Sequence, residues 1–170
     1  MQPTAQAVGS GKKRKPRKGR KIMPHTCGNL VVHLIFSTKQ RLPLIRPDFR
    51  FDLFAYLGGI VRELRETAII VNGTADHVHM LVKMRPSQSV ADLARLVKTN
   101  SSRWARAKEN SDFAWQTGYG AFSVSESKVA DVTRYIAKQE EHHKRHSFQA
   151  EFLLFLKRNH VVFDEKYLWD

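Results

Sequence analysis

Residues 67–84, TAIIVNGTADHVHMLVKM, contain two short apolar runs with a turn signal between them. The first run, 67–71, is rich in branched side chains and is closed by Asn72-Gly73, and the second run spans 76–84. Branched residues favour strands, and a short connection between two such runs favours a hairpin. We therefore expect two neighbouring antiparallel strands here.

Further strands and helices flank this hairpin in alternation. Residues 29–37 (NLVVHLIFS) and 119–124 are typical of strands. Helical spacing of apolar residues, with serines able to cap several starts, predicts four helices: 48–66, one from Ser87 or Ser89 to about 109, 126–145, and 147–159. The fold class is therefore α+β, with a central antiparallel sheet covered by helices. Because Gly58-Gly59 weakens the helix that contains it, we expect the pair to admit a closely approaching neighbour.

Composition restricts the function. The chain has 170 residues, 42% of them hydrophobic, which suffices for one core. Lys and Arg number 29 against 16 acidic residues, and the net charge of +13 points to a polyanionic partner and away from an acidic metabolic enzyme. The single cysteine, Cys27, excludes an intramolecular disulfide and a cysteine-based zinc finger. No apolar run approaches the ~20 residues of a membrane span, so we expect a cytoplasmic, nucleoid-associated protein.

Basic residues concentrate at the N-terminus. Residues 1–22 hold eight Lys or Arg and no acid, so we expect a disordered basic tail, followed by one domain over 23–170. The tail reads either as an arm that holds phosphates or as a solubilising or misannotated extension before Met23. The candidate DNA-binding residues are those of the tail and of the helix that ends near 109: Lys12, Lys13, Arg14, Lys15, Arg17, Lys18, Arg95, Lys98, Arg103 and Arg106.

Two histidines in the second strand of the hairpin are candidate metal ligands. Alternate side chains of a strand point to one face, so His77 and His79 should lie side by side with Val78 on the other face. Two imidazoles on a rigid strand form half of a metal site. The pair alone is a weak signal, and on its own it favours structural histidines over metal ligands.

The predicted helix 126–145 adds two polar groups. Tyr135 and Gln139 stand four residues apart, at the edge of its apolar stripe. Each could be structural: the tyrosine could pack its ring, and the glutamine could be solvated. Together with the histidine pair they supply a hydroxyl nucleophile, an amide oxygen and two imidazoles. A tyrosine with a pKa of ~10 needs a nearby cation to lose its proton and attack well.

The segments HLIFSTKQR, GTADHVHMLV and RYIAKQEEHH resemble the insertion-sequence-200-like, single-tyrosine HUH transposases, including the REP-associated tyrosine transposases. The resemblance covers Pro24 to Asp170 and implies a ferredoxin-like HUH endonuclease that cuts single-stranded DNA at hairpin-flanked ends. It implies that His77, His79 and Gln139 bind Mg²⁺ or Mn²⁺. Tyr135 would attack the scissile phosphate and form a 5′-phosphotyrosine. It also implies a homodimer with composite active sites.

Alternatives remain beside this interpretation. The chain could be a non-catalytic basic DNA-binding protein with a decayed site, or a domesticated REP-associated transposase. Asp76 could orient a histidine or cap a turn. Trp115 and Tyr119 could stack on unpaired bases or pack in the core. Three histidines could contact phosphate or mark a solvated helix end: His142, His143 and His146.

Overall fold

Four strands form one antiparallel sheet in the order β2-β3-β1-β4 in this computed structural model, which describes residues 27–109, 112–143 and 147–169. The strands are β1 (Leu30–Ser37), β2 (Thr67–Gly73), β3 (His77–Met84) and β4 (Gly120–Val124). β2 and β3 pair antiparallel as the expected hairpin, and β1 lies between β3 and β4. The predicted antiparallel sheet is therefore confirmed.

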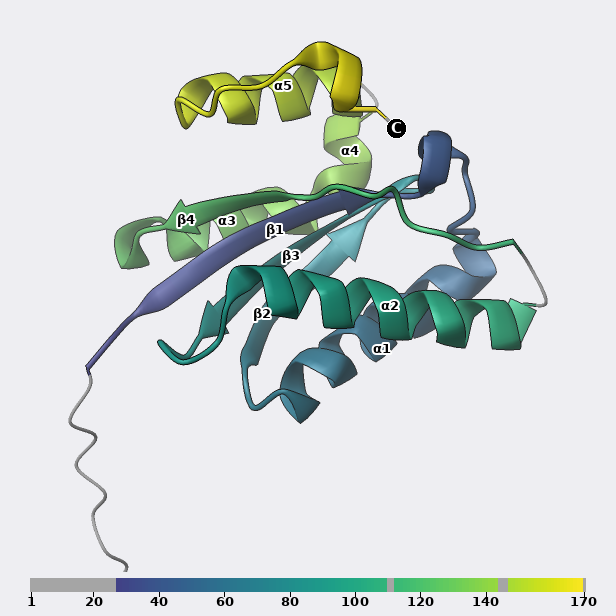
Figure 1. The fold of residues 1–170 in the computed structure, drawn as a ribbon, viewed down its shortest axis with the longest axis horizontal. Coiled ribbons are helices and arrows are strands. Elements are labelled where there is room, and N and C mark those ends of the chain that lie inside the picture. The colour runs from purple at the N-terminus through teal and green to yellow at the C-terminus, as the bar shows by residue number, and fades with distance from the viewer. Residues whose placement is uncertain (1–26, 110–111, 144–146, 170) are drawn as a thin grey trace, which may run out of the picture.

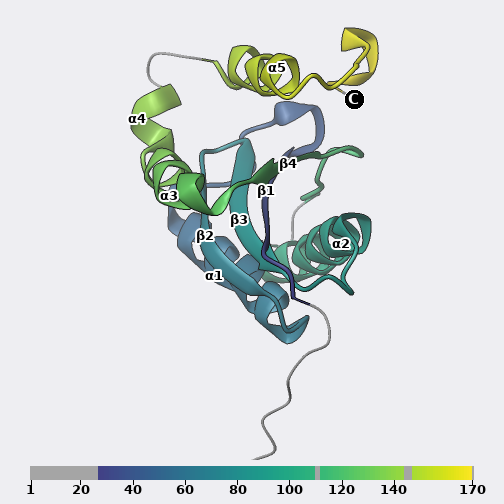
Figure 2. The same cartoon turned by 90° about the vertical axis from the view of Figure 1, so that its left-hand side faces the viewer.

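Helices lie on both sides of this sheet (Figures 1 and 2). Helices α1 (Pro47–Glu63) and α2 (Val90–Glu109) lie on one side, and α3 (Val129–Ala137) and α5 (Phe148–Arg158) lie on the other. The short α4 (Gln139–His143) follows α3. Within the described residues there are also three 3₁₀ turns: η1 (Lys39–Arg41), η2 (Glu126–Lys128) and η3 (Glu165–Tyr167). The α+β class and the order of the main elements agree with the sequence prediction.

The two faces of the central strands have different characters. Leu34 and Phe36 of β1 and Val78 of β3 belong to the apolar core shared with α1 and α2. His77 and His79 lie on the opposite face and are almost completely buried. This confirms the predicted alternation, because strand side chains point to opposite faces in turn.

The prediction of one continuous helix over 126–145 is wrong. This segment is divided into η2, α3 and α4, and Lys138 leaves helical geometry with φ −101° and ψ 20°. Asn72 Nδ2 on β2 donates to the carbonyl oxygens of Ile136 at 2.8 Å and Ala137 at 3.2 Å. These carbonyls would otherwise accept the amide groups of the following turn. The side chain of Asn72 therefore ends α3.

The expectation for Gly58-Gly59 is also wrong. A Cβ atom built at Gly58 would meet no heavy atom within 4 Å, and one at Gly59 would meet only the tip of Arg62 at 3.9 Å. Close approach occurs instead at Gly73, where a Cβ would lie 2.1 Å from the backbone oxygen of His77. Glycine is thus required at the hairpin, beside the histidine pair.

The expected basic tail, residues 1–22 with its six candidate DNA-binding residues Lys12, Lys13, Arg14, Lys15, Arg17 and Lys18, lies outside the described residues. Among the helices that the structure describes, none combines the length and the apolar character needed to cross a bilayer.

Candidate active site

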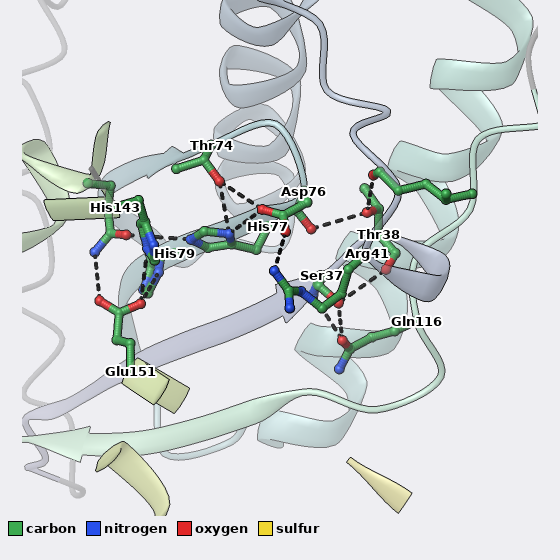
Figure 3. A network of polar contacts seen from close by, with 12 residues as sticks. Ser37, Thr38, Arg41, Thr74, Asp76, His77, His79, Gln116, His143 and Glu151 are labelled. Carbon is green, nitrogen blue, oxygen red and sulfur yellow. Dashed lines mark hydrogen bonds and ion pairs between the residues drawn. The ribbon is translucent and has the colours of Figure 1, made fainter. Parts of the chain in front are cut away.

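His77 is held in one orientation by polar neighbours (Figure 3). Its Nδ1 lies 2.7 Å from Asp76 Oδ1 and 2.9 Å from Thr74 Oγ1. Arg41 Nη2 donates to the other oxygen of Asp76 at 2.8 Å. Burial alone would raise the pKa of Asp76, but hydrogen bonds with His77 and Arg41 hold it below its usual range. A charged carboxylate at Nδ1 keeps the proton there and leaves Nε2 as a lone-pair donor.

His79 is oriented by a residue that sequence reasoning missed. Its Nδ1 lies 2.9 Å from Nε2 of His33 on β1. Burial lowers the pKa of His33 to about 4, so this ring is neutral near pH 7. Its Nε2 can therefore accept a hydrogen bond from Nδ1 of His79. The available signal was a lone histidine within the apolar run NLVVHLIFS.

Tyr135 on α3 lies beside the histidine pair within the same chain. Its ring centroid is 5.8 Å from that of His79 and 6.2 Å from that of His33, in both cases edge to face. Helix α3 is anchored by Ile136, which is fully buried against β1 and β3. The predicted nucleophile and the predicted ligands thus come together although they come from different elements.

Gln139 also reaches the site, although α3 ends before it. It begins α4, is fully buried, and its Oε1 lies 3.5 Å from Nε2 of His77. Its Nε2 points to Glu151 Oε1 at 3.5 Å. The amide oxygen is therefore directed toward the histidine, as a metal ligand would be.

Two further groups enter the site from α4 and α5. Glu151 is buried, and its Oε2 lies 3.1 Å from His143 Nε2 and 3.7 Å from His79 Nε2 (Figure 3). Burial raises the pKa of Glu151 to about 8. For His143, the interpretation as a solvated helix end is wrong. A single acid within the apolar helix FQAEFLLFL was the available signal for Glu151.

These side chains fit a divalent metal ion. One donor atom from each of four described residues, His77, His79, His143 and Glu151, lies within 4.8 Å of the others. Imidazole nitrogens with amide and carboxylate oxygens form a mixed donor set, whereas Mg²⁺ prefers oxygen ligands alone.

Helix α5 covers this cluster. The ring of Phe148 stacks on His77 with centroids 4.2 Å apart, and the ring of Phe155 lies 5.9 Å from that of Tyr135. With Glu151, these residues stand at i, i+3 and i+7, which is one face of a helix. The polar site is therefore enclosed between the sheet, α3 and α5.

The described candidate DNA-binding residues all lie on α2 and not beside the histidines: Arg95, Lys98, Arg103 and Arg106. Helix α2 packs against the opposite face of the sheet through Leu93 and Val97. Lys98 Nζ donates to the carbonyl oxygens of Thr117 and Gly118, and burial lowers its pKa to about 8. A DNA contact along α2 would therefore lie on the opposite side of the sheet from the histidine cluster.

The two aromatic residues considered for base stacking differ. Trp115 is buried, donates from Nε1 to Ser101 Oγ at 2.9 Å, and packs edge to face on Phe36. It belongs to the core. Tyr119 is 37% exposed, so its ring is accessible.

Comparison with known proteins identifies the family of this site. The family model described as "Transposase IS200 like" matches residues 26–139. The chain belongs to the IS200-like transposase family. The match includes His77, His79, Tyr135 and Gln139, and it ends before α5. As a member of the IS200-like family, the protein is a transposase and thus a DNA-cleaving enzyme.

Individual IS200-like relatives agree with the assignment. The chain is 27% identical to the ISDra2 transposase TnpA of Deinococcus radiodurans over 66% of this chain and 85% of the relative. It is 29% identical to the transposase for insertion sequence element IS200 of Salmonella typhimurium over 73% and 86% of the two chains.

Two solved structures share the fold. A candidate transposase from Deinococcus radiodurans aligns with a TM-score of 0.58 at 23% identity, covering 71% of this chain and 98% of that one. A REP-associated tyrosine transposase bound to a REP hairpin aligns with a TM-score of 0.50 at 10% identity, covering 70% and 69%.

Proposed function

We propose that this transposase cleaves and rejoins single-stranded DNA at hairpin-flanked ends, with Tyr135 as the nucleophile. The observation that carries the proposal is the position of the Tyr135 ring, 5.8 Å from that of His79. A structural relative bound to a REP hairpin adds support for a hairpin substrate. The same chemistry would serve a mobile element or a domesticated REP-associated transposase.

In this proposal His77, His79 and Gln139 hold Mg²⁺ or Mn²⁺, which supplies positive charge to polarise the phosphate and favour the phenolate. Tyr135 Oη attacks phosphorus in line as it loses its proton. The Oη–P bond forms, the P–O3′ bond breaks, and the leaving oxygen takes up a proton. The products are a 5′-phosphotyrosine and a free 3′-hydroxyl. Because the phosphoester bond is exchanged and not hydrolysed, a 3′-hydroxyl can reverse the step.

The nucleophile is tested by Tyr135→Phe, which removes one oxygen and little packing. With 3′-labelled single-stranded hairpin DNA and a divalent cation, the parent should give a labelled band that migrates with the protein on a denaturing gel. Tyr135→Phe should give neither adduct nor cleavage, while it binds the hairpin as the parent does.

Tyr119→Phe is the matched control, because it makes the same change at an exposed tyrosine, and it should keep both products. Cleavage by Tyr135→Phe at the parental rate would contradict the mechanism. A parent that binds hairpins but never cleaves them would favour the non-catalytic alternative.

We also propose that the protein acts as a homodimer with composite active sites. Exchange of an identical element between protomers preserves its contacts. Helix α3 of one chain could therefore make on a partner the contacts that it makes with β2 and β3 here. Co-refolding of Tyr135→Phe with His77→Ala should then regain cleavage that neither variant has alone. Heterodimers without recovered activity would contradict the composite site.

A further inference from the structure

The strongest unassigned feature is the pair His143 and Glu151. Both residues lie beyond Gln139, where the family match ends. They come from α4 and α5, yet their side chains meet those of His77 and His79 at one point (Figure 3). The additional helices therefore bring two groups with metal-binding chemistry to a site that the family match already contains.

We propose that His143 and Glu151 are ligands of the divalent metal ion, together with His77, His79 and Gln139. This inference rests on the proposed function, because it concerns the same metal centre. It makes α5 part of the catalytic centre as well as its cover.

The distances support a single ion. Glu151 Oε2 lies 3.1 Å from His143 Nε2 and 3.7 Å from His79 Nε2, and Gln139 Oε1 lies 3.5 Å from His77 Nε2. Bonds of about 2.0–2.2 Å around one ion separate its ligands by roughly 3–4 Å. The donor atoms thus need only small shifts to share an ion.

The charges of the proposed ligands also support a metal-binding role for Glu151. His77, His79 and Gln139 are neutral ligands, so on their own they leave both positive charges of the ion uncompensated. Glu151 is the acidic member of the described cluster, and it is only 6% exposed. A buried carboxylate is costly without a cation beside it. A bound divalent ion would add two positive charges beside Glu151, next to His143 and His79.

A purely structural role predicts a different outcome. If Glu151 and His143 served only to tie α5 to α4, their loss would lower the stability of the metal-free protein and leave the affinity for metal unchanged. A ligand role predicts a loss of affinity for Mn²⁺ in a protein that remains folded.

Calorimetric titration of the purified full chain with MnCl₂ distinguishes a ligand role from a purely structural role. Glu151→Gln keeps the shape of the side chain and removes its charge, and it should weaken Mn²⁺ binding by about tenfold or more, as should His143→Asn. Glu151→Asp retains a carboxylate and should recover part of the loss. Glu141→Gln makes the same change at an exposed residue of α4 and should bind as the parent does. Melting curves of the metal-free variants identify any that fail to fold.

The variant His77→Ala distinguishes a failure of this inference from a failure of the proposed function. If His77→Ala loses Mn²⁺ binding while folded Glu151→Gln, Glu151→Asp and His143→Asn bind at parental affinity, the inference is overturned and the proposed function stands. If the parent binds neither Mn²⁺ nor, in the same titration with MgCl₂, Mg²⁺, both the inference and the proposed metal site are overturned. Loss in His77→Ala and in Glu151→Gln, with partial recovery in Glu151→Asp, is the expected result.

Discussion

Single residues around the histidine pair act by fixing which ring nitrogen is available. Asp76 bonds to Nδ1 of His77 at 2.7 Å and is itself held by Arg41. Its charge favours a proton on Nδ1 and a lone pair on Nε2, which faces Gln139. The sequence alone allows Asp76 to be an orienting residue or a turn cap, and its contact with His77 supports the first role.

We predict that Asp76→Asn lowers the affinity for Mn²⁺ by roughly 10–100-fold, because the amide no longer fixes the proton of His77 on Nδ1. Calorimetric titration measures the effect. Asp48→Asn, at an exposed carboxylate that pairs with Arg46 at the start of α1, should leave the affinity unchanged. Equal affinities in Asp76→Asn and the parent would exclude an orienting role for the carboxylate.

Among the elements, the β2–β3 hairpin contains a glycine that leaves no space for a side chain. We predict that Gly73→Ala destabilises the protein by about 2 kcal/mol or more, because the new methyl group would meet the backbone oxygen of His77, which cannot rotate away. Gly58→Ala should instead stabilise it by up to about 1 kcal/mol, since the methyl group has space and alanine favours the helix. Urea unfolding measures both changes, and the same sign for the two variants would refute this explanation.

A strand or helix could be predicted from the sequence where the residues that determine it are close together in the chain. The branched runs on either side of Asn72-Gly73 predicted the hairpin, and strand alternation predicted the shared face of His77 and His79. The end of α3 was not predictable, because the group that ends it, Asn72, stands 64 residues away in the chain from Ile136. His33 and Glu151 were missed for the same reason: only packing of distant elements shows that their side chains meet the site.

On the scale of the whole molecule, the candidate DNA-binding residues lie away from the candidate active site. The described basic candidates line α2, on the sheet face opposite the histidines, and the densest basic segment precedes the domain. We predict that residues 12–21 add affinity for DNA without specificity. Each phosphate neutralised on a single strand contributes ~0.7 to the slope of log K against log salt.

Deletion of residues 1–22 should therefore flatten that slope while the preference for hairpins over unstructured strands stays the same. Fluorescence anisotropy at several salt concentrations measures both quantities. An unchanged slope would mean that the segment makes no phosphate contacts, as the alternative of a solubilising extension requires.

The cover that α5 forms over the site has a consequence for biosynthesis. A ribosome delivers a chain from its N-terminus, so β3 and α3 emerge before Phe148, Glu151 and Phe155 exist. Until then nothing stacks on His77 or packs beside the ring of Tyr135 from that side. The nascent protein thus acquires its histidines and its tyrosine early and encloses them last. A message cut short before codon 148 would yield a polypeptide in which Tyr135 and His77 lack the cover that α5 provides.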